Sequence, residues 1–146
     1  FMIKVAIASD HGGYELKQFI IKNLKDQYEF IDCGTNDSTS SVDYPDYAHY
    51  GCLKIQENQA QKLILICGTG IGISIAANKH NGIRCALCHT EYEAEMTRKH
   101  NNANAIALGG RVTGDQLALN IVKKFLTTEF EGGRHQIRID KISKLE

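Results

Sequence analysis

The segment 63–79 joins an uninterrupted apolar strand, a cysteine and a glycine-rich turn to the start of a helix. Residues 63–66 read LILI, Cys67 follows, and glycines occupy positions 68, 70 and 72. A short, wholly apolar run is typical of a strand buried on both faces, as in a parallel sheet. Glycines let the backbone turn tightly after such a strand. The segment therefore predicts one strand–turn–helix unit of an α/β fold.

The rest of the chain repeats this alternation of strands and helices. Five strands separated by helices predict a parallel sheet covered on both faces, with ligands bound at the carboxyl ends of the strands. We expect strands at 3–8, 30–32, 63–66, 84–88 and 105–108. We expect a first helix that ends near residue 24 and further helices at 47–58, 74–78, 91–100, 115–128 and 134–145.

Length and charge limit the classes of partner. A chain of 146 residues, 42% of them hydrophobic, is expected to form one domain over residues 2–146. Seventeen basic residues balance seventeen acidic ones, so no net field favours nucleic acid or a membrane surface, and a small-molecule partner is expected. No apolar run approaches a membrane span, no export signal is recognised, and five cysteines without a regular framework suit a reducing compartment. We expect a cytoplasmic protein.

Polar and reactive side chains follow four of the five expected strands. Asp10 and His11 follow the first strand, residues 67–72 the third, His89 the fourth and residues 109–111 the fifth. The carboxyl ends of parallel strands face one crevice, so these residues are expected at one edge of the sheet. Taken singly, each has a structural alternative, such as a helix cap, a turn residue or a solvated charge.

Cys67 is the candidate base or nucleophile. The N–H groups of the glycine turn and the positive end of the following helix would hold an oxyanion and favour a thiolate over a thiol. The alternative is a small, buried, unreactive residue at a strand end. The residues alone leave both interpretations open.

The sequence does not support several well-known motifs for nucleotide, haem or metal binding. Ile73 occupies the place of the third glycine of the dinucleotide fingerprint, and the Lys-Ser/Thr pair of a phosphate-loop NTPase is missing after the glycines. The run Cys85-Ala-Leu-Cys88-His89 has haem-attachment spacing but reads better as a core strand. The six histidines include no pair spaced to present two metal ligands from one helix, so no metal is expected.

Five motifs together carry a family resemblance that spans nearly the whole chain. They are Ser9-Asp-His-Gly12, Asp43-Tyr-Pro45, the run from Cys67 to Lys79, Arg98-Lys-His-Asn101 and Glu131-Gly-Gly-Arg-His135. In this order they resemble the B-type ribose-5-phosphate isomerases, within a wider family that includes galactose-6-phosphate and allose-6-phosphate isomerase subunits. The resemblance implies a Rossmann-like three-layer αβα sandwich, a homodimer or dimer of dimers, and no cofactor. It also implies interconversion of ribose 5-phosphate and ribulose 5-phosphate in the non-oxidative pentose phosphate pathway.

The resemblance also implies a role for each site residue. Cys67 is the base that moves the proton, Thr69 assists proton movement between the two oxygens, and His100 opens the sugar ring with Asp10 beside it. Some relatives use a glutamate in place of this cysteine. The implied substrate-binding residues are His11, Tyr44, Gly68, Gly70, Ile71, Gly72, Ser74, Asn101, Arg111, Arg134, His135 and Arg138.

The last helix is expected to act in trans. It carries Arg134, His135 and Arg138 behind Gly132-Gly133, and its apolar residues suit docking on a neighbouring subunit. The resemblance likewise implies that this end of the chain completes the partner's phosphate site.

Two other functions stay open at this point. A hexose 6-phosphate isomerase would need a pocket one carbon longer, which the sequence does not measure. A non-catalytic phosphosugar-binding module would leave Cys67 as packing, because a receptor needs no ionisable group beside its anion site. The complete set of implied catalytic residues argues against dependence on a different partner subunit.

Overall fold

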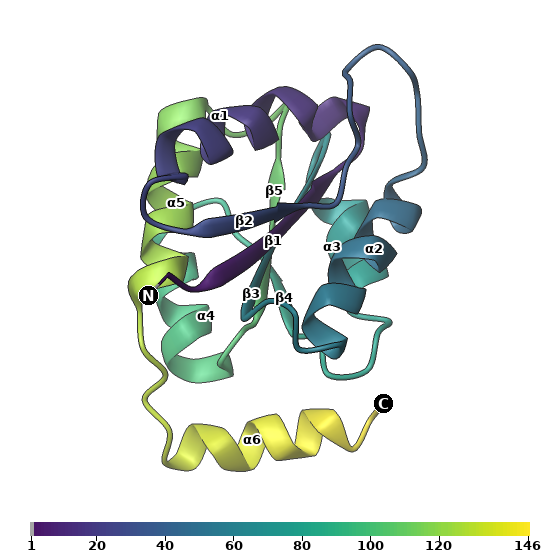
Figure 1. Ribbon diagram of the computed structural model, residues 1–146. Coiled ribbons are helices and arrows are strands. Elements are labelled where there is room, and N and C mark those ends of the chain that lie inside the picture. The colour runs from purple at the N-terminus through teal and green to yellow at the C-terminus, as the bar shows by residue number, and fades with distance from the viewer. Residues whose placement is uncertain (1) are drawn as a thin grey trace.

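The sheet is parallel throughout, as expected. The computed structural model describes residues 2–146, and these form one five-stranded sheet with the order β2-β1-β3-β5-β4 (Figure 1). The chain leaves β1 for β2 on one side and returns to β3 on the other, and ligands of open parallel sheets bind at such a reversal. The strands are β1 (Lys4–Ser9), β2 (Glu29–Asp32), β3 (Lys62–Cys67), β4 (Cys85–Leu87) and β5 (Ala105–Gly109).

Helices cover both faces of the sheet, which makes the fold a Rossmann-like three-layer αβα sandwich. Because side chains alternate along a strand, Val5 and Ile7 pack with α1, α4 and α5, whereas Ala6 and Ala8 pack with α2 and α3. The helices of the described residues are α1 (Tyr14–Leu24), α2 (Tyr44–Gln56), α3 (Ile71–Ala77), α4 (Glu91–Asn101), α5 (Asp115–Thr127) and α6 (Arg134–Ser143), with a 3₁₀ turn, η1 (His11–Gly13), before α1.

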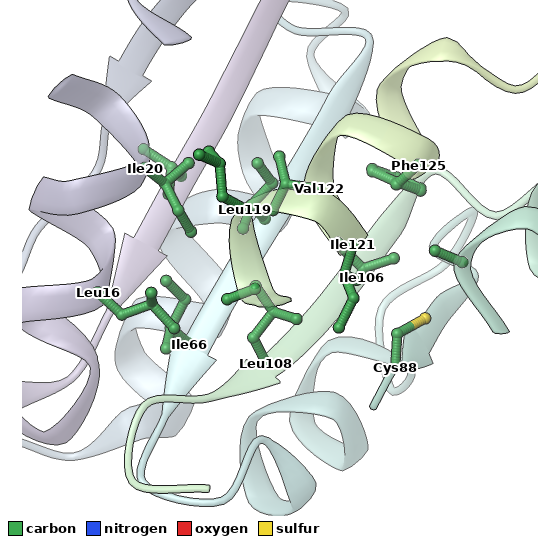
Figure 2. Packing of buried hydrophobic residues seen from close by; sticks show 14 of the residues in the cluster. Leu16, Ile20, Ile66, Cys88, Ile106, Leu108, Leu119, Ile121, Val122 and Phe125 are labelled. Carbon is green, nitrogen blue, oxygen red and sulfur yellow. The ribbon is translucent and has the colours of Figure 1, made fainter. Parts of the chain in front are cut away.

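The two faces are packed with side chains of different size. Figure 2 shows the face on which Ile66 and Leu108 meet Leu119 and Val122 of α5 and Ile20 of α1. Each such side chain stabilises the fold by about 1.5–3 kcal/mol when fully buried. Alanines line the strands on the other face, at positions 6, 8, 105 and 107, and allow α2 and α3 to lie close to the sheet.

Two helix starts differ from the sequence-based expectation. Helix α2 begins at Tyr44, not at 47, because a proline at position 45 is tolerated in the first helical turn. Helix α3 begins at Ile71, not at 74, because Gly70 adopts a left-handed φ of 82° and turns the chain directly into the helix. The glycine turn is therefore shorter than expected, and Ile71 to Ser74 are helical.

Helix α6 lies outside the three layers. Figure 1 shows it at the end of the molecule opposite to the junction of β1 with η1 and α1. Only His135 and Ile139 of this helix are buried, and its main neighbour is α4. Ile137 and Ile142 are exposed, so much of the apolar surface of α6 is left uncovered within one chain. Among residues 2–146, no helix combines the length and apolar character needed to cross a bilayer.

Candidate active site

Cys67 is the last residue of β3 and lies under the glycine turn. The backbone N–H of Gly70 donates a hydrogen bond to Cys67 Sγ over 3.2 Å, and only 4% of the residue's surface is exposed. The N–H of Ile71 is taken by Thr69 Oγ1 at 3.2 Å, and the Ser74 hydroxyl donates to the carbonyl of Ile71 at 2.7 Å. The N–H groups of Gly70 and Ile71 thus already have hydrogen-bond partners. The donors that remain for an oxyanion include the N–H of Gly72, which has no partner within the helix because it belongs to the first turn.

Glycines let three loops at the carboxyl ends of β1, β3 and β5 interlock. A Cβ added at Gly13 would lie 2.6 Å from the carbonyl oxygen of Ile66, and one at Gly110 would lie 2.5 Å from that of Gly12. A Cβ at Gly109 would lie 2.6 Å from the carbonyl oxygen of Thr69. Because each of these contacts is with backbone, no side chain fits without displacing a loop. The contacts fix the three loops relative to one another.

The interlocked loops bring Asp10, Cys67 and Arg111 to one edge, as expected. Asp10 is buried, and its Oδ1 accepts the N–H of Gly13 at 3.1 Å, so the carboxylate also caps η1. The Arg111 guanidinium lies over the turn, because its Nη1 would be 3.3 Å from a Cβ built on Gly68. An acidic, a sulfhydryl and a cationic group thus lie together at this edge of the sheet.

Two further predicted residues lie at this edge of the sheet. His11 Nδ1 accepts the N–H of Val42 at 3.2 Å, which places the proton of a neutral ring on Nε2. The Tyr44 ring lies against Gly72, where an added Cβ would be 2.6 Å from the ring. Position 72 therefore accepts no side chain larger than that of glycine, because the Tyr44 ring covers it.

Burial disfavours ionisation of the four other thiols. It raises the pKa of Cys52 and Cys88 to about 12, and it raises the pKa of Cys33 and Cys85 as well. These residues behave as packed thiols at neutral pH.

The remaining predicted residues form a second cluster along α4 and α6. A groove of about 340 Å³ is lined by His100 and Asn101 of α4 and by Arg134, His135 and Arg138 of α6. The rings of His100 and His135 are stacked, with centroids 4.3 Å apart and planes at 15°. Desolvation lowers the pKa of His135, and the neighbouring His100 and Arg134 lower it further.

This second cluster lies at the opposite end of the sheet from Cys67. Helix α4 starts beyond the carboxyl end of β4 and runs back, so that Arg84 Nε, just before β4, donates to the carbonyl of Asn101 at 3.0 Å. The five residues of β5 span the sheet from its amino edge to its carboxyl edge, and a strand of this length is about 16 Å long. Within one chain, the predicted site residues are therefore two separate groups, and His100 does not meet Cys67.

Glu131 and Arg98 contribute to the second cluster, although sequence reasoning gave neither a role. Glu131 Oε1 lies 3.5 Å from His135 Nε2 and 3.8 Å from His100 Nε2. Buried Arg98 donates to the carbonyl of Thr128 at 3.0 Å and so ties the chain leading to α6 to α4. The four-residue spacing of Glu131 and His135 was a usable signal, whereas the contact with His100 depends on tertiary packing.

Comparisons with known proteins agree with this architecture. The sequence profile described as Ribose/Galactose Isomerase matches residues 5–142. Ribose-5-phosphate isomerase B of Escherichia coli (strain K12) is 45% identical over 146 residues, covering 99% of this chain and 97% of that protein.

Solved structures agree as closely. Ribose-5-phosphate isomerase B of Clostridium thermocellum superposes with a TM-score of 0.96 at 51% identity, covering 98% of this chain and 97% of that one. The ribose 5-phosphate isomerase of Thermotoga maritima superposes with a TM-score of 0.95 at 49% identity and covers 99% of both chains.

Proposed function

The chain belongs to the ribose/galactose isomerase family and is a sugar phosphate isomerase, and from this premise we propose that it interconverts D-ribose 5-phosphate and D-ribulose 5-phosphate. The observation that carries the proposal is the pairing of Cys67 with the interlocked glycine loops. Aldose–ketose isomerisation needs a base at the reacting carbons and donors at the oxygens. Cys67 supplies the base, and the start of α3 supplies the donors.

The proton transfer follows from this arrangement. The Cys67 thiolate takes the proton from C2 of the open-chain aldose, and the electron pair moves through the new C1–C2 double bond to O1. The resulting cis-enediolate is held by backbone N–H groups at the start of α3. The Thr69 hydroxyl, which accepts the Ile71 N–H and keeps its own proton, assists proton movement between O2 and O1. The Cys67 thiol then returns its proton to C1.

Ring opening requires a second chain. His100 is the proposed acid–base residue for opening the furanose, with Asp10 beside the ring oxygen. Within one chain these two residues lie at opposite edges of the sheet, and the separation of about 16 Å exceeds the length of a five-carbon sugar phosphate. We therefore infer a homodimer or dimer of dimers in which α4 and α6 of one subunit complete the Cys67 site of its partner.

The phosphate has cationic partners in both halves of such a site. His11 and Arg111 lie at the same sheet edge as Cys67, and Arg134, His135 and Arg138 line one groove beside α6. Arginine binds phosphate oxygens through several parallel N–H donors, which holds the substrate in one orientation. The exposed Ile137 and Ile142 supply apolar surface for the contact between subunits.

A comparison of substrates tests the proposal. Purified protein is offered ribose 5-phosphate, allose 6-phosphate and galactose 6-phosphate without added cofactor, and the initial rate of ketose formation is measured. We expect ribose 5-phosphate to have the highest kcat/KM. A higher kcat/KM for either hexose 6-phosphate would assign the chain to a hexose reaction, and binding without turnover of any of the three would refute catalysis.

A further inference from the structure

Two imidazoles and one carboxylate converge between α4 and α6. The ligand atoms of His100, Glu131 and His135 all lie within 4.8 Å of one another. Glu131 Oε1 lies between the two rings, 3.8 Å from His100 Nε2 and 3.5 Å from His135 Nε2. Two neutral imidazoles and a carboxylate are a donor set that binds divalent transition metals.

One atom of this cluster is buried without a hydrogen-bond partner. His135 is 7% exposed, and its Nε2 is a buried side-chain nitrogen left unsatisfied in the described part of the chain. Buried polar atoms are normally paired, because leaving one unpaired costs about 1–3 kcal/mol. This nitrogen faces Glu131, so a group able to bind both atoms would satisfy it.

The distances from Glu131 to the two histidines are close to those of a tetrahedral site. Ligands bonded to zinc at about 2.0–2.1 Å lie roughly 3.3 Å apart. The two nitrogen–oxygen distances exceed this value by less than 0.6 Å. Because the rings of His100 and His135 are stacked with their planes at 15°, the His100 ring must turn out of this stack to aim its nitrogen at a shared cation. The side chains of Glu131 and His100 are 50% and 42% exposed and can rotate, whereas His135 is held by burial. Glu131 and His100 can thus move to bind a cation that is already bound to His135.

The surroundings restrict which cation can bind. Arg134 and Arg138 line the same groove and repel any cation. Magnesium and calcium, which prefer oxygen ligands, would gain little from the two imidazoles to offset that repulsion. Zinc forms strong bonds to imidazole nitrogen and needs only three protein ligands, with water in the fourth position. We propose that His100, Glu131 and His135 form a binding site for a divalent transition-metal ion, with Zn²⁺ as its best ligand.

Occupation of this site would inhibit the enzyme. Zn²⁺ bound to His100 Nε2 removes the lone pair that this residue needs as an acid–base group in ring opening. This consequence rests on the proposed function, whereas the binding site itself does not. Zn²⁺ is therefore expected to act as a reversible inhibitor that a chelator removes.

Calorimetric titration of the metal-free protein with ZnCl₂ tests the binding. We expect one Zn²⁺ per chain, unaffected by excess Mg²⁺. Glu131→Gln and His135→Gln should each weaken binding by more than the roughly 10- to 100-fold that loss of an outer-shell partner costs. Because buried His135 also supports packing, thermal unfolding is measured for both variants, and half-exposed Glu131 provides the decisive one.

Two control variants separate this site from the other candidates. His49→Gln removes the hydrogen bond of 2.9 Å between His49 and His80, and Cys67→Ser removes the thiol. Both should bind Zn²⁺ as the wild type does, and Co²⁺ bound to the protein should show no thiolate-to-metal absorption band. Unchanged affinity in folded Glu131→Gln, or loss of binding in either control, would overturn the assignment.

Isomerase activity provides an independent test of the proposed inhibition by Zn²⁺. Zn²⁺ at the concentration that saturates the calorimetric site should inhibit ribose 5-phosphate isomerisation, and EDTA should restore it. Full activity at saturation would refute the inhibitory role. If the chain turns over no sugar phosphate, the proposed function fails, while the titration still decides whether the metal site exists.

Discussion

Cys67 differs from the other cysteines in what surrounds its sulfur. Its Sγ accepts the backbone N–H of Gly70 in the glycine turn, whereas Cys52 and Cys88 are fully buried among apolar side chains. The same residue type thus serves as a packing group at positions 52 and 88 and as the proposed base at the end of β3.

Cys67→Ala should abolish isomerisation and leave substrate binding within a few-fold of the wild type. The thiolate moves a proton and does not hold the phosphate, and loss of a general base costs about 10²–10⁴ in rate. Turnover and calorimetric binding of ribose 5-phosphate provide the two measurements. Cys33→Ser, which removes a thiol outside the three interlocked loops, is the control and should remain active. Appreciable turnover by Cys67→Ala would show that another group is the base.

The free energy of unfolding should fall as the pH rises above about 9. Burial raises the pKa of Cys52 and Cys88 in the folded protein to about 12, from an ordinary value of 9.0. Between these values the unfolded chain releases protons that the folded chain keeps, so the stability present below pH 9 is progressively lost. Each thiol contributes at most about 1.4 kcal/mol per pH unit.

Urea unfolding at pH 8 and pH 10 measures this loss. A Cys52→Ala, Cys88→Ala double variant, although less stable at pH 8 because of the cavities it creates, should lose less stability between the two pH values. Equal losses in the double variant and the wild type would show that other groups control alkaline unfolding.

At the scale of elements, the glycine turn before α3 is fixed by sterics as well as by backbone conformation. Gly70 and Gly82 have nearly the same φ, 82° and 79°. A Cβ at Gly70 would lie 2.8 Å from the backbone carbon of Leu108, whereas a Cβ at Gly82 meets nothing within 4 Å. A comparison of the two glycines therefore distinguishes the cost of backbone strain, which both share, from the cost of collision with β5, which applies only to Gly70.

Gly70→Ala should therefore be much more harmful than Gly82→Ala. Both substitutions place a side chain in the left-handed region, which costs about 1–2 kcal/mol. Only Gly70→Ala also displaces the turn that donates an N–H to Cys67, so it should lower both the melting temperature and kcat. Thermal unfolding and turnover of both variants test this difference. Similar losses in the two variants would mean that collision with β5 is unimportant.

The elements themselves were largely predictable from the sequence, because local patterns specify them. Apolar runs identified all five strands, and the amphipathic spacing identified the helices. The start of α2 was predicted three residues too late because Pro45 occupies the first turn of the helix. The cluster of His100, Glu131 and His135 was not predicted, since the spacing of Glu131 and His135 does not reveal their contact with His100, which depends on the packing of α4 against α6.

At the scale of the whole molecule, the proposed active site is divided between the two ends of the sheet. Cys67 and Asp10 lie at the carboxyl edge, and His100 lies at the end of α4 that returns to the amino edge. Helix α6 extends this second group away from the three layers with exposed apolar residues (Figure 1). A single chain is thus expected to contain two half-sites, and a dimer two complete ones.

Mixing two inactive variants tests whether the site is shared. Cys67→Ala and Arg138→Ala should each be nearly inactive as homodimers. In a two-fold heterodimer of the two, one site carries both defects and the other carries neither. Random subunit exchange forms heterodimers in half of the population, so the mixture should recover about a quarter of wild-type activity.

A second mixture is the matched control. Cys67→Ala with Arg111→Ala places both defects at the carboxyl edge, so each site of the heterodimer keeps one defect and no activity should return. Recovery of about a quarter of the activity in the first mixture and none in the second is the result expected of a shared site. An inactive first mixture after verified subunit exchange would show that α6 serves its own subunit, and would contradict the division of the active site between two chains.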